Sequence, residues 1–443
     1  MIKMIFSPVP VLVNQRNMSY ETIEAISLLN LNSIQRNSLV NMSDFILSTD
    51  TDESTGLVNL CYKHDYEDDS TNPNNELVKN CRGVVFDGQN VVMKAFGYTD
   101  EYSSVDGADK IKDRFDQIEG GLVSCSVYES HEGSLIRIFN FKGKWFLTTH
   151  RKLNAFKSKW SSTGESYGTS FKNALKDELV HNEKFQEKFP VVFDSILDNF
   201  FHMLNPEKQY MFLVCNTRDN RIVCNAPRIA TMYHVGTFVN YELDLNDDIF
   251  ITKPRKLMFE SEAELIDYVN NQVDPYKNPG VIVFAPSNKQ FKVTCREYIE
   301  LFKLRGNQPS LKFRYLQLRM DQYANDMFQN LYPDSVHIFN SCEEDLGEIS
   351  KFIHTSYMNR FVHKQYTSVP VPEYIVMQTA HKWFLEDRDN RRVTNRVIYD
   401  ILNEQNATYL NQMLKRHRHE KVVKNALNAK SMPPLEHLTR FDI

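Results

Sequence analysis

Two patterns of hydrophobic spacing follow one another along the chain. From about residue 78 to 301, short apolar runs alternate with polar turn residues, which is typical of β-strands. Beyond 307–310, apolar residues recur every three or four positions, which is typical of helices. We therefore predict two domains, an α+β core over residues 1–306 and an α-helical C-terminal domain over 307–443.

Within the core, apolar runs bounded by turn residues predict strands and hairpins. The predicted hairpins are 81–96, with its turn at Asp87 and Gly88, and 135–149, with its turn at Lys142 and Gly143. Further strands are expected at 1–13, 210–215, 281–286 and 290–295.

Helical spacing is expected at the start of the core, in its middle and in the C-terminal domain. Residues 19–47 predict a helical N-terminal segment, and 171–204 predict a charged helical insertion. An acidic, asparagine-rich loop at 66–76 follows the first segment. In the C-terminal domain the clearest helix is expected over 394–416, while SVPVPE at 368–373 interrupts the helical pattern.

Composition adds limits on the class of protein. The 443 residues are 42% hydrophobic and 12% aromatic, which supports sizeable cores and argues against disorder as the main state. The formal net charge of -5 and a pI near 6.2 exclude a chain that binds polyanions through its overall charge. Any nucleic-acid site must therefore be a local basic patch.

Cysteine usage and hydropathy bear on the compartment. Seven cysteines are far apart and include no C-x-x-C pair, so we expect a reducing environment and no disulfide framework.

The histidines show no metal-ligand spacing, so no metal site is predicted. No run approaches 18 uncharged apolar residues, and the N-terminus is a poor signal peptide. The expectation is a soluble cytoplasmic protein without a membrane span.

A series of short motifs runs through the strand-rich region in a fixed order. The order begins with CRGVVF at 81–86 and MKAF at 93–96, followed by SHEGSL at 130–135 and LTTHRK at 147–152. It continues with MFLV at 211–214, NRIV at 220–223, PGVIV at 279–283 and FKVT at 291–294.

This order resembles that of the bacteriophage-type RNA ligases, a family of covalent nucleotidyltransferases related to DNA ligases and capping enzymes. The resemblance covers roughly residues 78–302 and implies a core of antiparallel sheets with flanking helices. In that family a lysine of a K-x-D-G-S motif attacks the α-phosphate of ATP or GTP and forms a lysyl–nucleotide intermediate. Two glutamates and a second lysine support the ribose, the divalent metal and the phosphate.

The residues that carry this chemistry are largely replaced. Ser130 stands at the position of the nucleophilic lysine. Phe212 and Pro279 stand at the two glutamate positions, and Thr294 replaces one of the final lysines. The resemblance therefore implies no catalytic residues, because a serine hydroxyl lacks the amine that forms the labile phosphoramidate.

Three alternatives to a lost nucleophile stay open. His131 could form a phosphoramidate, although neighbouring residues of a strand point to opposite faces. Lys303 begins a K-x-x-G pattern that ends at Gly306, after the last motif. Lys94 would be the nucleophile if the lysine motif were aligned differently.

The resemblance also implies which residues would contact a nucleotide, if a site for ATP and Mg²⁺ persists. These are Arg82, Lys94, Glu132, Gly133 and Lys292. For the cationic members, the alternative is a set of solvated side chains on hairpins.

Two basic regions are candidates for nucleic-acid binding, because lysines and arginines neutralise phosphates and aromatic side chains stack on bases. Residues 388–430 contain ten lysines and arginines against four acids, and a solvated helix face explains the same pattern. The candidate residues are Lys144, Arg151, Lys152, Arg391, Arg392, Lys415, Arg416 and Arg418.

We interpret the chain as a degenerate RNA-ligase-like pseudoenzyme that binds a nucleotide, a nucleic acid or, through its C-terminal helices, a protein partner. One alternative is an active but divergent ATP-dependent RNA ligase or nucleotidyltransferase. Another is a structural or assembly scaffold. Proteins of this kind occur in large DNA viruses as well as in phages, so a viral protein of the host cytoplasm or the virion is expected.

Overall fold

The computed structural model describes most of the chain. The described residues are 47–62, 79, 81–87, 91–94, 96–105, 107–161, 164–215, 217, 220–286 and 289–431, without the side chains of 47, 48 and 428–431. Several expected features lie outside them: the first strand at 1–13, the helix at 19–47 except its last residue, the loop at 66–76 and Gly88 of the first turn.

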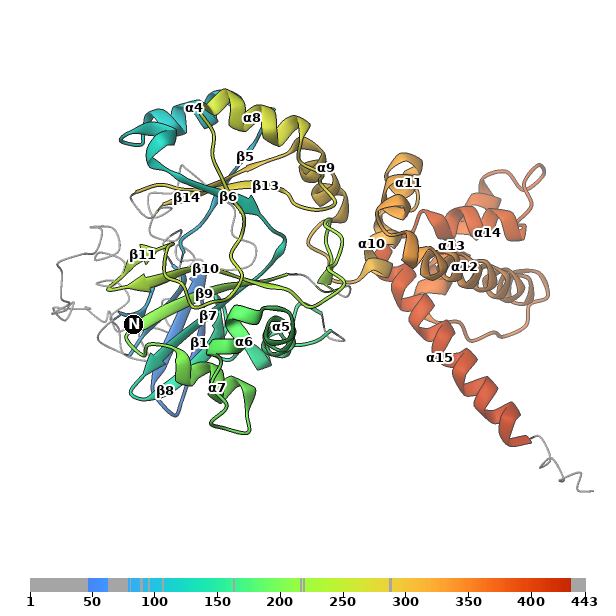
Figure 1. Ribbon diagram of the computed structural model, residues 1–443. Helices are drawn as coiled ribbons and strands as arrows, with labels where there is room; N and C mark the ends of the chain where they lie inside the picture. Colours follow the sequence, from blue (N-terminus) through green and yellow to red (C-terminus); the bar gives the residue numbers. More distant parts are fainter. Residues whose placement is uncertain are drawn as a thin grey trace, which may run out of the picture. The chain divides into compact units, whose positions relative to one another are not determined.

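The chain divides into two compact units, Met1–Phe302 and Lys303–Ile443. The N-terminal unit contains all fourteen strands that the structure describes, and these form three sheets. The described part of the C-terminal unit is helical. The α+β class expected from the sequence is therefore confirmed, together with a helical C-terminal region (Figure 1).

Strand order is β1-β2-β3-β4 in the first sheet, β11-β10-β9-β7-β8 in the second and β12-β6-β13-β14-β5 in the third. All pairs are antiparallel except β14 with β5, which is parallel. The strands are β1 Leu47–Asp52, β2 Leu57–Tyr62, β3 Arg82–Phe86, β4 Val91–Met93, β5 Asp100–Ser103, β6 Ser126–Ser130, β7 Gly133–Phe141, β8 Lys144–Thr149, β9 Lys208–Cys215, β10 Met232–Val239, β11 Glu242–Asp244, β12 Lys256–Leu257, β13 Gly280–Phe284 and β14 Gln290–Thr294.

Helices cover the outer faces of the second and third sheets. In Figure 1, α5, α6 and α7 lie against the second sheet, while α4 and α8 lie across the third. These elements are α4 Ala108–Asp116, η2 Gly121–Ser124, η3 Ala155–Lys157, α5 Tyr167–His181, α6 Glu183–Lys188, α7 Ile196–Met203 and α8 Glu262–Asn271; α9, Arg296–Arg305, spans the division between the units.

The β7–β8 hairpin has its turn where the sequence predicts it. Lys142 and Gly143 both adopt left-handed backbone conformations, with φ of 52° and 82°. The side chain of Asn140 accepts the Gly143 N–H at 3.0 Å, which fixes the turn. Two left-handed residues match the twist of an antiparallel pair, so this prediction is confirmed.

The expected helical insertion at 171–204 consists of three helices instead of one continuous segment. Ser166, Asn182 and Ser195 each accept a backbone N–H of the turn that follows, so each begins a new helix. The apolar sides of α5, α6 and α7 pack on the second sheet through Phe171, Phe185 and Phe200, all fully buried.

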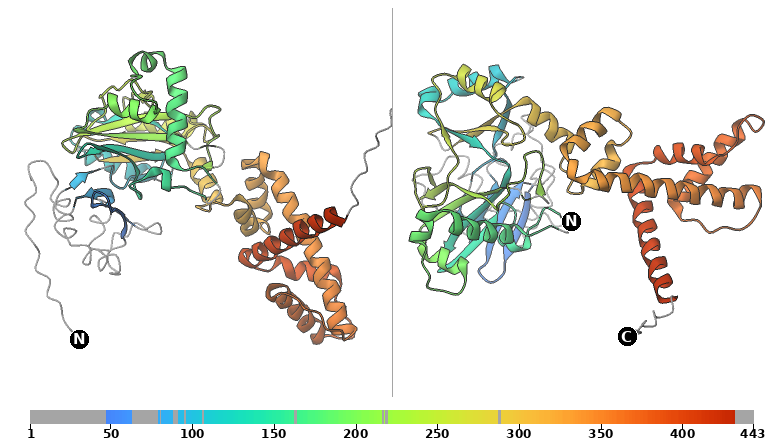
Figure 2. Two further views of the ribbon diagram at one scale, coloured as in Figure 1. Left: turned by 90° about the horizontal axis from the view of Figure 1, so that it is seen from below. Right: turned by 45° about the vertical axis from the view of Figure 1, so that its right-hand side comes forward.

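The C-terminal unit is built around α12, which is long and largely buried on one side. Figure 2 shows α15 crossing α12 in its left-hand view. The helices of this unit are α10 Leu311–Leu318, α11 Gln322–Leu331, the short turn η5 Pro333–Ser335, α12 Val336–Tyr357, the π-helical turn η6 Met358–Val362, α13 Val371–Glu386, α14 Asn395–Asn403 and α15 Ala407–Ser431.

The prediction of a single helix over 394–416 is wrong, because two helices, α14 and α15, occupy this stretch. The first of them begins where the sequence predicts a helix, and Thr394 caps α14 by accepting the N–H of Val397. The side chain of Asn406 then accepts the N–H of Tyr409 at 3.0 Å, which begins α15. The interruption expected at 368–373 is present, although α13 already begins at Val371.

Candidate functional site

Three of the replaced positions meet at the end of the third sheet. Ser130 on β6 and Thr294 on β14 both lie directly opposite Gly280 of β13, and Pro279 precedes that glycine. We call Ser130, Gly280 and Thr294 the Ser130 row. Ser130 is 3% exposed and Thr294 is 2% exposed, so the row is closed to solvent.

Alternation along the strands shows which way the row faces. Phe291 of β14 packs on Phe115 of α4, on the outer face, with ring centroids 5.3 Å apart. Thr294, three residues further along β14, therefore faces inward. Tyr128, two residues before Ser130, packs with residues of the second sheet, so Ser130 faces the same space between the two sheets.

Aromatic side chains fill much of that space. Phe96 packs against Phe284 of the third sheet at 5.7 Å and against Phe238 of the second at 5.4 Å. Tyr128 and Phe284 lie 5.9 Å apart, and Met211 belongs to the same buried cluster. The two sheets are therefore joined by a packed core beside the row.

Lys292 is the lysine that the chain retains in its last motif, FKVT, and it forms an ion pair with a carboxylate. Its Nζ lies 2.9 Å from Oε1 of Glu101 on the neighbouring β5. The pairing of β14 with β5 places the two residues opposite each other. The charge that would stabilise a phosphate is thus offset by an acid that the motif does not contain.

Phe212 does not join the row, which corrects the expectation that it shares a site with Ser130. It is fully buried on the helix-covered face of the second sheet. Its ring packs on Phe171 of α5 and Phe200 of α7, with centroids 5.4 and 5.8 Å away. Its neighbours Met211 and Leu213 point to the opposite face and are also apolar.

The carboxylate of Glu132 accepts hydrogen bonds from the backbone of a loop about ninety residues away in the chain. Its Oε1 accepts the N–H of Ile222 at 2.8 Å, and its Oε2 accepts those of Val223 at 2.8 Å and Cys224 at 3.1 Å. The hydroxyl of Tyr298 also donates to Oε2 at 3.2 Å. Burial, and then the Glu132 charge, raises the pKa of Tyr298, so this phenol stays protonated and donates. Glu132 was predicted to bind nucleotide, but its carboxylate ties the connection between β6 and β7 to this loop and to α9.

The close approach of β7 to β9 requires a glycine at position 133. A Cβ at this position would lie 3.0 Å from the carbonyl carbon of Val214 and 3.1 Å from Cγ of Leu213. Glycine therefore lets β7 begin in close contact with β9. This packing accounts for Gly133 without a nucleotide.

Arg82 and Lys94, the other two predicted nucleotide contacts, belong to the first sheet and the segment after it. Nη1 of Arg82 donates to the Gly97 carbonyl at 3.1 Å and lies 3.4 Å from Oγ1 of Thr99. The backbone N–H of Lys94 donates to the side chain of Gln209 at 3.3 Å. Arg82 thus holds the chain that leads from the first sheet to the third.

Arg137 is a buried cation that the motif comparison misses. It is fully buried and donates to the carbonyl of Gly83, to Oδ1 of Asn59 at 3.1 Å and to the carbonyl of Thr149 at 2.6 Å. Burial lowers its pKa to about 9. A charged residue inside the apolar run LIRIF was the available signal. Arg137 joins the first sheet to the second.

His131, the alternative nucleophile, lies outside the Ser130 row. Its ring stacks on Tyr233 of β10, with centroids 4.3 Å apart and planes 15° from parallel. Burial lowers the pKa of His131, although the nearby charge of Glu129 opposes this. Lys303, the third alternative, lies in the last turn of α9.

Two of the three cations predicted at 144–152 to bind nucleic acid pair with acids of β1. Nζ of Lys144 lies 3.3 Å from Asp52, and Nζ of Lys152 lies 2.8 Å from Asp50. Arg151 donates to the carbonyl of Tyr62 at 2.8 Å. These three cations therefore have partners, which the sequence could not reveal because β1 is about a hundred residues away.

A cavity of about 280 Å³ lies beside these ion pairs. One wall is aromatic, with Trp145 stacked on Phe201 at 5.6 Å. Asp50 and Asp52 also line the cavity. Its lining residues are Asp50, Thr51, Asp52, Lys144, Trp145, Phe146, Leu147, Leu153, Asn154, Phe156, Lys157, Leu197 and Phe201.

The cations predicted in the C-terminal unit are mostly engaged as well. Arg416 makes two hydrogen bonds of 2.7 Å to the buried Glu373, and Arg418 lies 2.6 Å from Asp345. Arg391 pairs with Glu386, and Arg392 donates to the backbone carbonyls of Arg388, Asp389 and Arg391. Lys415 is exposed.

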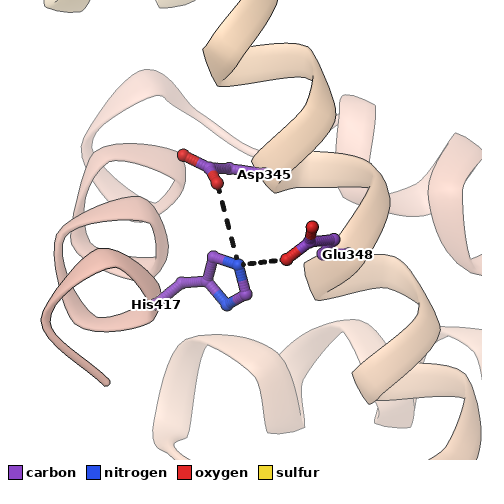
Figure 3. Close-up of side chains that lie close together, drawn as sticks. All are labelled: Asp345, Glu348 and His417. Atoms are coloured by element: carbon purple, nitrogen blue, oxygen red, sulfur yellow. Dashed lines mark hydrogen bonds and ion pairs between the residues drawn. The ribbon is translucent and has the colours of Figure 1, made fainter. Parts of the chain in front are cut away.

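One group in the described chain has the composition of a metal site. Asp345 and Glu348 of α12 converge on His417 of α15, with potential ligand atoms within 4.8 Å of one another (Figure 3). Nε2 of His417 lies 2.9 Å from Glu348 and 3.8 Å from Asp345. His417 belongs to the basic stretch 388–430 that is singled out in the sequence for its lysines and arginines.

Cations already satisfy these carboxylates. Lys421 lies 3.0 Å from Asp345 and 2.7 Å from Glu348, and Arg418 also binds Asp345. Burial alone would raise the pKa of Asp345, but hydrogen bonds from Arg418 and Lys421 outweigh it, and the pKa lies below its usual range. A divalent ion would be repelled by both cations. The group is therefore an ion-pair network that fixes α15 on α12.

All seven cysteines are free thiols. Burial raises the pKa of Cys81 and Cys215 to about 12, which makes these thiols unreactive. Among the described helices, none is both long and apolar enough to cross a membrane.

Three viral proteins are similar to the chain. An immediate-early protein ICP-46 homolog of Invertebrate iridescent virus 6 is 28% identical over 381 residues, which are 82% of this chain and 82% of that protein. The homolog of Invertebrate iridescent virus 3 is 26% identical over 362 residues, 78% of this chain and 75% of that protein. Immediate-early protein ICP-46 of Frog virus 3 (isolate Goorha) is 26% identical over 287 residues, 62% of this chain and 65% of that protein.

No protein-family model matches the chain. Among solved structures, an archaeal ATP-dependent RNA ligase aligns at 13% identity with a TM-score of 0.35, over 73% of this chain and 78% of that chain. A protein described as a "putative ATP-dependent DNA ligase from Aquifex aeolicus" aligns at 12% identity with a TM-score of 0.36, over 70% of this chain and 79% of that chain.

Proposed function

We propose that the chain is a catalytically degenerate, RNA-ligase-like protein of a large DNA virus, which acts by binding instead of by lysyl–nucleotide chemistry. The ICP-46 relatives support the viral origin. The motif order of the sequence supports the ligase-like core. The observation that carries the proposal is the Ser130 row, where two buried hydroxyls face the space between the sheets.

The chemistry of the row does not fit ATP and a divalent metal. A lysyl–nucleotide intermediate needs an amine at the position of Ser130, and a hydroxyl there would give a stable phosphodiester. Metal and ribose need carboxylates, and β9 carries none. Lys292 is paired with Glu101. We therefore derive no reaction step at this site.

The first test is nucleotide binding. We expect ATP or GTP at about 1 mM, with Mg²⁺ or Mn²⁺, to leave the melting temperature of the protein unchanged. A nucleotide present at about a hundredfold excess over its Kd would stabilise the folded state by about 2.7 kcal/mol, which raises the melting temperature by several degrees. Differential scanning fluorimetry detects a change of that size.

The Lys292→Ala variant makes the nucleotide test specific. A stabilisation by ATP that disappears in this variant would show a retained nucleotide pocket and contradict the expectation that the Ser130 row does not hold ATP. A stabilisation that survives in the variant would place nucleotide binding elsewhere in the chain. Lys289→Ala is a matched control, because it removes the same charge at an exposed position just before β14.

A further inference from the structure

The end of α12 departs from regular helix geometry where it meets α13. Residues Met358–Val362 form a single π-helical turn directly after α12. Such turns are rare and recur at functional sites. This one presents Phe361 to His381 of α13, and the two rings stack with centroids 4.0 Å apart and planes 21° from parallel.

His381 lies at the centre of a set of stacked rings. Phe384, one turn later on α13, lies further from His381, with centroids 6.2 Å apart and planes 27° from parallel. The hydroxyl of the buried Tyr357 lies 3.3 Å from Nδ1 of His381 and fixes the orientation of the imidazole. Phe361, His381 and Phe384 remain partly exposed, so part of each ring is accessible to solvent although Tyr357 holds His381 in place.

Two exposed cations lie near His381. Lys364 and Arg388 are both exposed, and each lies close enough to His381 to act on it, because burial and then these two charges lower the pKa of the imidazole. Within the described residues, no ion pair engages either side chain. This separates them from Arg416 and Arg418, whose charges are offset by acids.

The loop between α12 and α13 adds a further aromatic group. Tyr366 is 90% exposed and lies two residues beyond Lys364. Lys364 itself has a left-handed backbone, with φ of 58°, which turns the loop away from the axis of α12. We call Phe361, Lys364, Tyr366, His381, Phe384 and Arg388 the His381 surface.

We propose that the His381 surface binds single-stranded nucleic acid. Unpaired bases can stack on exposed rings, and phosphates can be neutralised by Lys364 and Arg388. A duplex hides the faces of its bases, so single strands fit this surface better. The proposal concerns the C-terminal unit alone and does not depend on whether the N-terminal unit has lost ligase chemistry.

The test uses the full chain and fluorescein-labelled single-stranded RNA and DNA of about 20 nucleotides, followed by fluorescence anisotropy. We expect His381→Ala to weaken binding about fivefold or more, since one lost stacking contact has that effect. His381→Phe should restore binding, because it keeps an aromatic ring at the same place. A purely structural role of the Tyr357 hydrogen bond would not be rescued in this way.

Charge reversal tests the cations. We expect Lys364→Glu with Arg388→Glu to weaken binding at least about tenfold and to lower its salt dependence. Lys424→Glu, with Lys351→Glu, is the matched control, because these cations are also exposed and lie on α15 and α12 of the same unit. The control should change the affinity less than about twofold, because weakly placed surface charges contribute little.

Several results would overturn the proposal. Equal losses in the test and control variants would mean non-specific attraction to charge. Equal affinity for double-stranded RNA would exclude base stacking. Competition by polyglutamate as strong as that by single-stranded RNA would indicate an acidic protein partner, and a wild-type chain that binds no single strand would refute the site directly. Nucleotide binding by the N-terminal unit is read by a separate assay, so the two proposals fail separately.

Discussion

Replacing Gly83 by alanine is expected to lower the free energy of unfolding of the N-terminal unit by about 3–5 kcal/mol. Gly83 has φ of +79°, a conformation that side chains other than glycine adopt at a cost of about 1–3 kcal/mol. An added Cβ would also lie 2.7 Å from the carbonyl oxygen of His150 and against the Arg137 guanidinium. Forcing these groups apart adds about 1–3 kcal/mol.

The measurement is urea unfolding followed by tryptophan fluorescence in a Trp383→Phe background. The remaining two tryptophans, Trp145 and Trp160, both belong to the N-terminal unit, so the signal reports this unit alone. Gly143→Ala is the matched control, since Gly143 has nearly the same φ, +82°, but nothing within 4 Å of an added Cβ. It should cost only about 1–2 kcal/mol. Equal losses in both variants would contradict the proposed packing of Gly83 on Arg137.

The second large effect is expected for Glu132→Gln, which keeps the shape of the side chain but removes its charge and one acceptor oxygen. Three backbone N–H groups and the Tyr298 hydroxyl now donate to the two carboxylate oxygens. The amide nitrogen of glutamine must face some of these donors. We expect the free energy of unfolding of the N-terminal unit to fall by about 2–4 kcal/mol, because hydrogen bonds to charged groups are strong.

Glu129→Gln provides the control for this variant. Glu129 lies on β6, three residues before Glu132, and makes an ion pair with Arg255, whose side chain is 62% exposed. Removing that exposed pair should cost less than about 1 kcal/mol. If both variants unfold at the same urea concentration, Glu132 does not hold the loop at Ile222–Cys224, and its assignment as a nucleotide contact becomes open again.

Local features of the fold follow well from the sequence. The Lys142–Gly143 turn, the strands β9, β13 and β14 and the start of a helix near residue 394 are all encoded by residues close to one another in the chain. The break between α14 and α15 at Asn406 was not predicted, because the apolar spacing continues across it. Spacing alone does not register a capping side chain that restarts a helix.

The features that could not be predicted depend on contacts between residues far apart in the chain. Lys144 and Lys152 looked like a basic patch because their partners, Asp52 and Asp50, are about a hundred residues away. Phe212 was placed in the site by position in a motif, but strand alternation puts it on the opposite face of the sheet. Ser130 and Thr294 did come together, because β6 and β14 both pair with β13.

The central claim is that the ligase-like core no longer forms a covalent nucleotide intermediate. The direct test incubates the full chain with ATP or GTP labelled at the α-phosphate, with Mg²⁺ or Mn²⁺, next to an active RNA ligase as positive control. We predict no label on the protein after denaturing electrophoresis. An acid-labile band on the wild-type chain would contradict the claim, and its loss in Lys94→Ala, His131→Ala or Lys303→Ala would identify the nucleophile.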